Sequence, residues 1–219
     1  EKKSDDGSIH DKDNGYTLGL TVPPYTLNGT AVTTFLAALN AGTTLPDTDI
    51  KPVYRSDSSG TTDNFQKYLA AAAPESWKKG AGSEFQGGAG EGAQKSAGVV
   101  QAVQATPGAI GYVEKSPAAA AGLPFAQIDT GSGAVELTDD NAKKAIASAK
   151  FAKDGNDLAL DLKSLYSTKE AGAYPLVLAT YEIVCSKGYD ADTAGAVKSF
   201  LTVAANQGQA NLSAAGYVP

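Results

Sequence analysis

Cysteine and histidine are almost absent from this chain of 219 residues, which contains one of each. A single cysteine excludes an internal disulfide and a zinc site built on several thiolates. Cys185 lies in an apolar run of strand type, so we predict a buried and unreactive thiol. His10 lies in a charged amino-terminal stretch, and a catalytic pair of histidine with cysteine or serine is therefore not expected.

The chain also lacks long apolar runs and a surplus of basic residues. No stretch reaches the roughly 18 apolar residues of a membrane-spanning helix. No signal peptide opens the sequence, as in a secreted protein after removal of its leader or in a cytoplasmic protein. The net charge of −6 argues against a nucleic-acid partner, because nucleic-acid surfaces need clustered lysine and arginine. A few donors at contact distance can still hold an anion, since they outweigh distant screened charges.

Strand-like and helix-like segments alternate along most of the chain. We predict strands at residues 16–22, 50–54, 109–113, 125–129 and 174–185. We predict helices at residues 28–40, 60–73, 97–105, 139–149 and 192–207 and a glycine-rich loop at residues 80–98. In the last helix, Val197, Phe200, Leu201 and Ala204 are predicted to face inward. The alternation indicates an α/β fold with a mixed sheet flanked by helices.

A polar stretch from Arg55 to Thr61 joins a predicted strand to the helix that follows. The first turn of a helix has N–H groups without partners and a partial positive charge, and both suit an anion. Gly60 permits close approach of a ligand, while Ser59 and Thr61 add hydroxyl donors. Arg55 can present a planar fork to two anion oxygens, and Asp57 can orient it by a salt bridge. From the residues alone, an ordinary helix cap and an anion site remain alternatives.

Two motifs resemble a known family. The string VYRSDSSGTTDNFQKYL, which begins at Val53, closely resembles the R-[AS]-D-x-S-G-T segment of the phosphate-binding subunit of the high-affinity phosphate ABC importer. The string PGAIGYVE, which begins at Pro107, matches a second stretch of that family and follows in the expected order. The resemblance extends from about Ala37 to Pro219 and includes the shorter strings LPD and YPL.

The resemblance implies a periplasmic-binding-protein type II lobe that binds inorganic phosphate for a membrane permease. It implies an extracytoplasmic location, in the periplasm or at the cell surface, with or without a lipid anchor. Carried over position by position, it implies phosphate contacts by four residues, with Asp57 bracing the first of them: Arg55, Ser59, Gly60 and Thr61. Tyr112 and Glu114 are expected to be only a core strand residue and a strand end.

The chain departs from that family in its first part, because the first-lobe loops that complete the family's ligand site do not appear before Lys51. We therefore expect a largely missing first lobe. Residues 1–15 would be a flexible leader, residues 16–50 a remnant of the first lobe and hinge, and residues 51–219 the phosphate-binding second lobe with its return segment. The alternative is a binding-incompetent lobe or relative that acts as a surface or assembly module.

We expect neither enzymatic activity nor a metal or cofactor. An enzyme built on Asp57 with Ser58 or Ser59 would lack a nearby general base of suitable pKa. The acidic and sulfur-containing residues also lack the spacing of metal ligands. The sequence therefore predicts a binding protein.

Overall fold

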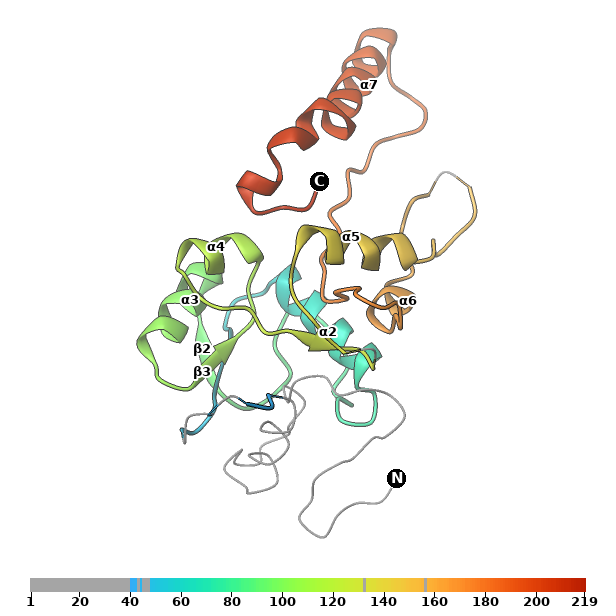
Figure 1. Ribbon diagram of the computed structural model, residues 1–219. Coiled ribbons are helices and arrows are strands. Elements are labelled where there is room, and N and C mark those ends of the chain that lie inside the picture. Colours follow the sequence, from blue (N-terminus) through green and yellow to red (C-terminus); the bar gives the residue numbers. More distant parts are fainter. Residues whose placement is uncertain (1–39, 43, 45–47, 132, 156) are drawn as a thin grey trace. The chain divides into compact units, whose positions relative to one another are not determined.

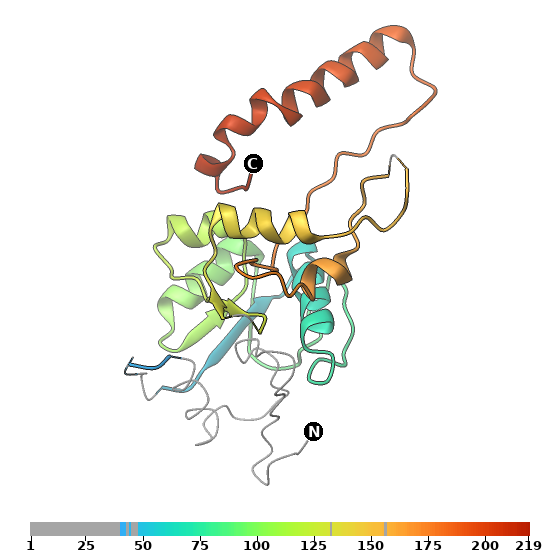
Figure 2. The same cartoon turned by 45° about the vertical axis from the view of Figure 1, so that its right-hand side comes forward.

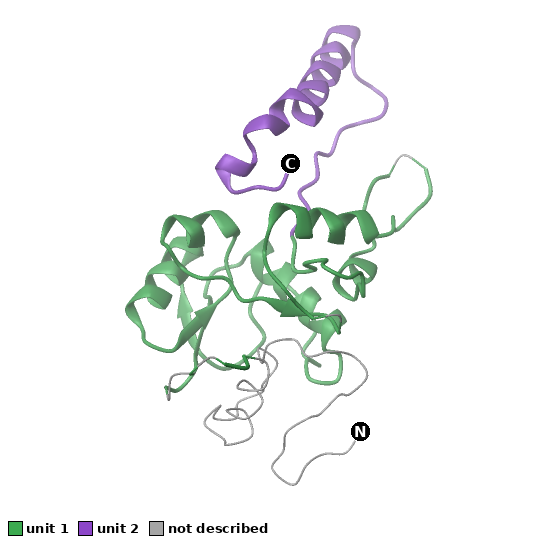
Figure 3. Ribbon diagram, viewed as in Figure 1, with its two compact units in different colours: residues 1–177 green, residues 178–219 purple. Residues whose placement is uncertain are grey.

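The structure is a computed structural model that describes residues 40–42, 44, 48–131, 133–155 and 157–219. The predicted strand at residues 16–22 lies outside the described residues, as does the predicted helix at residues 28–40 except for Asn40. The chain divides into two compact units, residues 1–177 and residues 178–219 (Figure 3). The residues of the predicted anion site all belong to the first unit.

The main sheet of the first unit has three parallel strands in the order β2-β1-β3. They are β1 (Lys51–Arg55), β2 (Glu91–Ala93) and β3 (Ala109–Gly111). Helix α2 (Gly60–Ala72) follows β1, and helix α3 (Lys95–Ala105) follows β2. The two helices lie on opposite sides of the sheet (Figures 1 and 2). The carboxyl end of β1 therefore lies at a topological switch point, where open α/β sheets commonly bind ligands.

Shorter elements complete the first unit. They are α4 (Lys115–Ala120), β4 (Ile128–Asp129), β5 (Ala134–Val135), α5 (Asp139–Ser148) and α6 (Leu162–Tyr166). Strands β4 and β5 form a separate antiparallel pair. Helix α6 contacts both α2 and α5, and α4 contacts α3. The predicted α/β class is confirmed, although the two strand directions are divided between two sheets and are not mixed within one.

Local sequence explains where the helices begin and end. The Ser59 hydroxyl accepts the Thr61 N–H at 3.1 Å and caps α2, which ends before Pro74. The Thr138 hydroxyl accepts the Asn141 N–H at 3.1 Å and caps α5. The predicted helix starts at residues 60 and 139 are thus confirmed.

Aromatic side chains join α2 to its neighbours. Phe65 of α2 stacks on Tyr112, which follows β3, with ring centroids 4.4 Å apart. Tyr68 meets Tyr166 of α6 edge-on with centroids 6.1 Å apart, and both rings are almost fully buried. Each such buried ring stabilises the fold by about 1.5–3 kcal/mol. The start of α2 is therefore held firmly against the sheet.

One loop prediction and one strand prediction need correction. The predicted loop at residues 80–98 contains β2, whose glycine-rich sequence has low strand propensity and which forms by pairing with β1. Gly90 allows this approach, because a Cβ there would lie 2.4 Å from the Pro52 carbonyl oxygen. The predicted strand at residues 125–129 is reduced to Ile128–Asp129, which pair with β5.

The second unit contains α7 (Ala191–Ala205) and two short 3₁₀ helices, Gln207–Asn211 and Ser213–Ala215. The helix is confirmed, but the inward face predicted for it is only partly covered. Val197, Leu201 and Ala204 are half-buried, whereas 62% of Phe200 is exposed and no residue of the helix is fully buried. Within this unit the only element that covers α7 appreciably is the first 3₁₀ helix.

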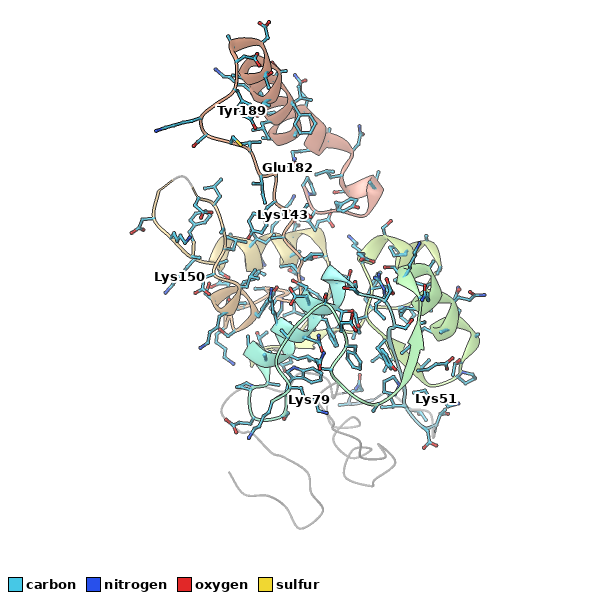
Figure 4. The ribbon with its side chains drawn as sticks, turned by 180° about the vertical axis from the view of Figure 1, so that it is seen from behind. Lys51, Lys79, Lys143, Lys150, Glu182 and Tyr189 are labelled. Atoms are coloured by element: carbon cyan, nitrogen blue, oxygen red, sulfur yellow. The ribbon has the colours of Figure 1, made fainter. Side chains whose placement is uncertain are left out.

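The segment before α7 differs most from prediction. Residues 174–185 form no strand, because no described segment offers them a ladder of backbone partners. Cys185 is exposed, so the prediction of a buried thiol is wrong. Glu182 and Tyr189 project from the same irregular stretch (Figure 4). None of the helices in the described part of the chain is long and apolar enough to cross a membrane.

Candidate anion-binding site

The carboxyl ends of the three parallel strands bring together side chains from distant parts of the sequence. Arg55 is the last residue of β1, Ser96 lies in the first turn of α3 after β2, and Glu114 follows β3. Arg55 donates from Nη1 to Ser96 Oγ at 3.1 Å, and Ser96 Oγ donates to Glu114 Oε2 at 2.5 Å. Parallel strands place their carboxyl ends at one edge, so this cluster follows directly from the topology.

The predicted pair of Arg55 and Asp57 is present and has two-point geometry. Arg55 Nε lies 2.8 Å from Asp57 Oδ1, and Nη2 lies 2.6 Å from Oδ2. The Lys95 N–H also donates to Asp57 Oδ1, at 2.8 Å. These hydrogen bonds hold the pKa of Asp57 well below its usual range. The hydrogen bond with Asp57 in turn raises the pKa of Arg55, so both groups are ionised at neutral pH.

The first turn of α2 lies next to Arg55 in sequence and is open to solvent. Gly60 is exposed, and its N–H donates to none of the described residues. Ser59 is buried and accepts the N–H groups of Thr61 and Thr62 at 3.1 and 3.5 Å. The Ser59 oxygen thus serves as the helix cap, while its hydroxyl proton stays available for another acceptor. The cap and the anion site are therefore compatible uses of the same residue.

Tyr112 connects the backbone of Arg55 to the start of α2. Its hydroxyl oxygen accepts the Arg55 N–H at 3.2 Å and lies 2.7 Å from Thr62 Oγ1. Burial raises the pKa of Tyr112, so the phenol remains neutral. Tyr112 is a buried core residue as expected, but it follows β3 and is not part of the strand, and its hydroxyl additionally ties β1 to α2.

Gln66 anchors the glycine-rich loop against the start of α2. Its amide nitrogen donates to the carbonyls of Gly82 and Glu84 at 2.7 and 3.0 Å, and its oxygen accepts the Gln86 N–H at 2.7 Å. The Ser59 N–H donates to the Ser83 carbonyl at 2.8 Å. The loop therefore fixes the residue that caps α2. Sequence reasoning missed this role, because a glutamine within an amphipathic helix gives no local signal of a loop partner.

Glu114 is the member of the cluster that sequence reasoning assigned to a mere strand end. Its two carboxylate oxygens accept hydrogen bonds from Thr61 Oγ1 and Ser96 Oγ, each at 2.5 Å. Burial raises the pKa of Glu114, but these hydrogen bonds and the charge of Arg55 outweigh it and lower the pKa overall. The position of Glu114 shortly after a parallel strand was the sequence signal that could have placed it at the edge of the sheet with Arg55.

Comparison with known proteins identifies the family of the chain. A family described as "PBP superfamily domain" matches residues 22–207. Phosphate-binding protein PstS 3 of Mycobacterium tuberculosis is 50% identical over 186 residues, which are 84% of this chain and 50% of the relative. Over the same shares, PstS 2 of Mycobacterium tuberculosis is 48% identical and phosphate-binding protein PstS of Xylella fastidiosa is 32% identical. The chain spans about half the length of the curated relatives it matches.

The family match covers every strand that contributes to the cluster and extends through α7. The relatives are named as binding proteins and not as enzymes, in agreement with the expectation from sequence. The resemblance detected in the two motifs is likewise confirmed. This chain belongs to the PBP superfamily.

Proposed function

We propose that the protein binds inorganic phosphate outside the cytoplasm and presents it to the membrane permease of a phosphate ABC importer. The observation that carries the proposal is a guanidinium braced at two points by Asp57 beside the open first turn of α2. This arrangement occurs in a chain about 50% identical to proteins named for phosphate binding. The net charge of −6 provides no surplus of basic residues, so local donors must hold the anion.

Each predicted ligand residue has a defined part in this proposal. Arg55 has five N–H groups, of which three donate to Asp57 and Ser96, so two are left for phosphate oxygens. The Gly60 N–H and the Ser59 hydroxyl proton supply further donors at the start of α2. Thr61 contributes its hydroxyl oxygen at the edge of the proposed phosphate site. Asp57 contacts no phosphate and keeps the guanidinium in the orientation that these donors require.

The proposed division of the chain follows the same reasoning. Residues 51–219 form the phosphate-binding second lobe and return segment, residues 16–50 a remnant of the first lobe and hinge, and residues 1–15 a leader. The relatives are about twice as long as the matched segment, and a phosphate held between two lobes gains contacts from both. Each charge-assisted hydrogen bond contributes about 1.5–3 kcal/mol, so one lobe alone binds phosphate much more weakly than two.

Isothermal titration calorimetry with inorganic phosphate tests the proposal on the whole chain. We expect submillimolar binding that is lost in Arg55→Ala and weakened at least tenfold in Arg55→Lys, which keeps the charge but not the fork. Lys78→Ala removes the same charge from an exposed ion pair with Glu75 and serves as the matched control. Binding that persists unchanged in Arg55→Ala would remove the site assignment.

A binding-incompetent lobe that acts as a surface or assembly module is the second candidate. It is favoured by the half-length match and by the Thr61 hydroxyl, which already donates to Glu114. The same titration separates the two functions. A flat phosphate trace from a chain that unfolds cooperatively would favour the module and contradict the transport role.

A further inference from the structure

Phe85 is the large apolar side chain of residues 80–90, the part of the glycine-rich loop that precedes β2. The residues on either side of it are exposed, whereas Phe85 is half-buried and packs against the core. Its ring stacks on Tyr54 with centroids 4.6 Å apart, and its centroid lies 6.1 Å from that of Tyr112. One loop side chain therefore packs against β1 and against the segment that follows β3.

Both aromatic neighbours of Phe85 hold Arg55. Tyr54 precedes Arg55 in β1, and the Tyr112 hydroxyl accepts the Arg55 backbone N–H at 3.2 Å. The Phe85 ring thus lies against the two residues that fix the backbone of Arg55. A displacement of the ring would shift the strand end from which the guanidinium extends, because closely packed side chains transmit strain to their neighbours.

The same loop holds the other end of the anion site. The Ser83 carbonyl, two residues before Phe85, accepts the Ser59 N–H at 2.8 Å. Ser59 caps α2, so this hydrogen bond fixes the open first turn of the helix. The loop therefore connects the residue that carries the guanidinium to the residue that starts α2, although no residue of the loop is a predicted phosphate contact.

Glycine at position 87 leaves the space that the Phe85 ring occupies. A Cβ on Gly87 would lie 2.2 Å from Cζ of Phe85, well inside the normal carbon–carbon contact of about 3.5–4 Å. Gly82 of the same loop differs, because nothing lies within 4 Å of the Cβ position there. Neither glycine has a left-handed backbone. Alanine at these two positions therefore differs mainly in whether it displaces the ring.

We propose that Phe85 is a positioning residue that holds Arg55 and the start of α2 in the relative position that phosphate requires. The inference rests on the proposed phosphate-binding function. Phe85 contacts no ligand and acts through the residues against which its loop packs. Coupling between two sites is reciprocal, so bound phosphate must stabilise the loop by the same factor by which the loop strengthens phosphate binding.

Isothermal titration calorimetry of the whole chain with inorganic phosphate tests the positioning role. Gly87→Ala should weaken phosphate binding about tenfold, because its methyl group displaces the Phe85 ring, whereas Gly82→Ala should leave the affinity unchanged. Phe85→Leu should also weaken binding about tenfold, because it removes the ring. Leucine leaves room for the methyl group, so adding Gly87→Ala to Phe85→Leu should weaken binding by less than about twofold. Additive losses would show that Gly87 does not act through the ring.

Hydrogen–deuterium exchange on the same proteins separates positioning from simple coverage of the core. Saturating phosphate should slow amide exchange in residues 80–90 several-fold in the unaltered protein and in Gly82→Ala. This response should be lost in Phe85→Leu. A ring that only covered the core would lower the free energy of unfolding when removed, but phosphate would not change the exchange of the loop.

The outcomes for the positioning role and for phosphate binding itself are distinct. If the unaltered protein binds phosphate while Phe85→Leu keeps its affinity and the loop does not respond, this inference is wrong and the phosphate-binding function stands. Urea denaturation shows which variants are folded, and if Gly87→Ala is not, Phe85→Leu carries the test. If the unaltered protein does not bind phosphate, the proposed function fails and takes this inference with it.

Discussion

Arg55 and Asp57 form a planar pair in which Nε and Nη2 of the guanidinium each meet one carboxylate oxygen, at 2.8 and 2.6 Å. The two residues are separated by a single position, and the pair is possible because the chain turns sharply between β1 and α2. The backbone N–H of Lys95 joins the same carboxylate from the start of α3. Asp57 therefore orients Arg55 and also links two strand ends.

Asp57→Asn should weaken phosphate binding about tenfold. The amide nitrogen of asparagine would face an arginine N–H, so two donors would meet and the guanidinium would turn away from the anion site. Calorimetry with phosphate measures the effect. Glu75→Gln, which removes an equal charge from an exposed position, is the control. Tighter phosphate binding in Asp57→Asn would show that repulsion by Asp57 outweighs its orienting role.

Gln66→Leu should lower the free energy of unfolding by about 2–4 kcal/mol, because it leaves backbone groups of the glycine-rich loop without partners. Gln66 is fully buried and makes three hydrogen bonds to that loop. Urea denaturation measures the change. Gln104→Leu removes one hydrogen bond at an exposed glutamine and should cost less than about 1 kcal/mol. Equal effects of the two variants would contradict the anchoring role of Gln66.

Acid should destabilise the protein through the same cluster. The pKa values of Asp57 and Glu114 are lowered in the folded state, so their contribution to stability is complete above the unfolded-state values near pH 4. It is lost as pH falls from there toward the lowered folded-state values. Urea denaturation between pH 7 and pH 3 should show a smaller loss in Glu114→Gln than in the unaltered protein. If the free energy of unfolding falls equally with pH in both proteins, the pKa of Glu114 does not differ between the folded and unfolded states.

The start of α2 could be predicted from sequence because the relevant signals are local. Ser59 caps the helix, Gly60 begins it, and Arg55 and Asp57 are close enough in sequence to pair. Each of these relations depends on residues within one turn or one loop. The strand-to-helix junction was therefore accessible to reasoning from residue types, whereas the four phosphate contacts come from the resemblance to a known family and stay predictions.

The rest of the cluster depends on long-range topology. Ser96 and Glu114 reach Arg55 and Thr61 only because β2 and β3 flank β1, and β2 has no strand-like sequence of its own. The apolar pattern of α7 predicted burial that is only partly present. Spacing predicts which residues share a face, but only a packed neighbour buries that face, and Phe200 is exposed.

Lys95 has a left-handed backbone, with φ of 58°, at the point where its N–H reaches Asp57. A residue with a Cβ pays about 1–2 kcal/mol for this conformation, whereas glycine adopts it without that cost. Lys95→Gly keeps the N–H and should stabilise the protein by up to about 1 kcal/mol, after the larger chain entropy of glycine is subtracted. Lys95→Val should destabilise it, because a β-branched residue tolerates this region poorly. Urea denaturation at neutral pH measures both.

The control for Lys95 is a lysine in ordinary helical conformation. Lys143 lies on the exposed side of α5 (Figure 4), and Lys143→Gly should destabilise the protein by about 1 kcal/mol. The same substitution would thus have opposite signs at the two positions. If Lys95→Gly destabilises the protein as much as Lys143→Gly, the left-handed conformation is not a source of strain. If the signs differ, the left-handed backbone at Lys95 is a source of strain at the point where its N–H reaches the carboxylate of Asp57.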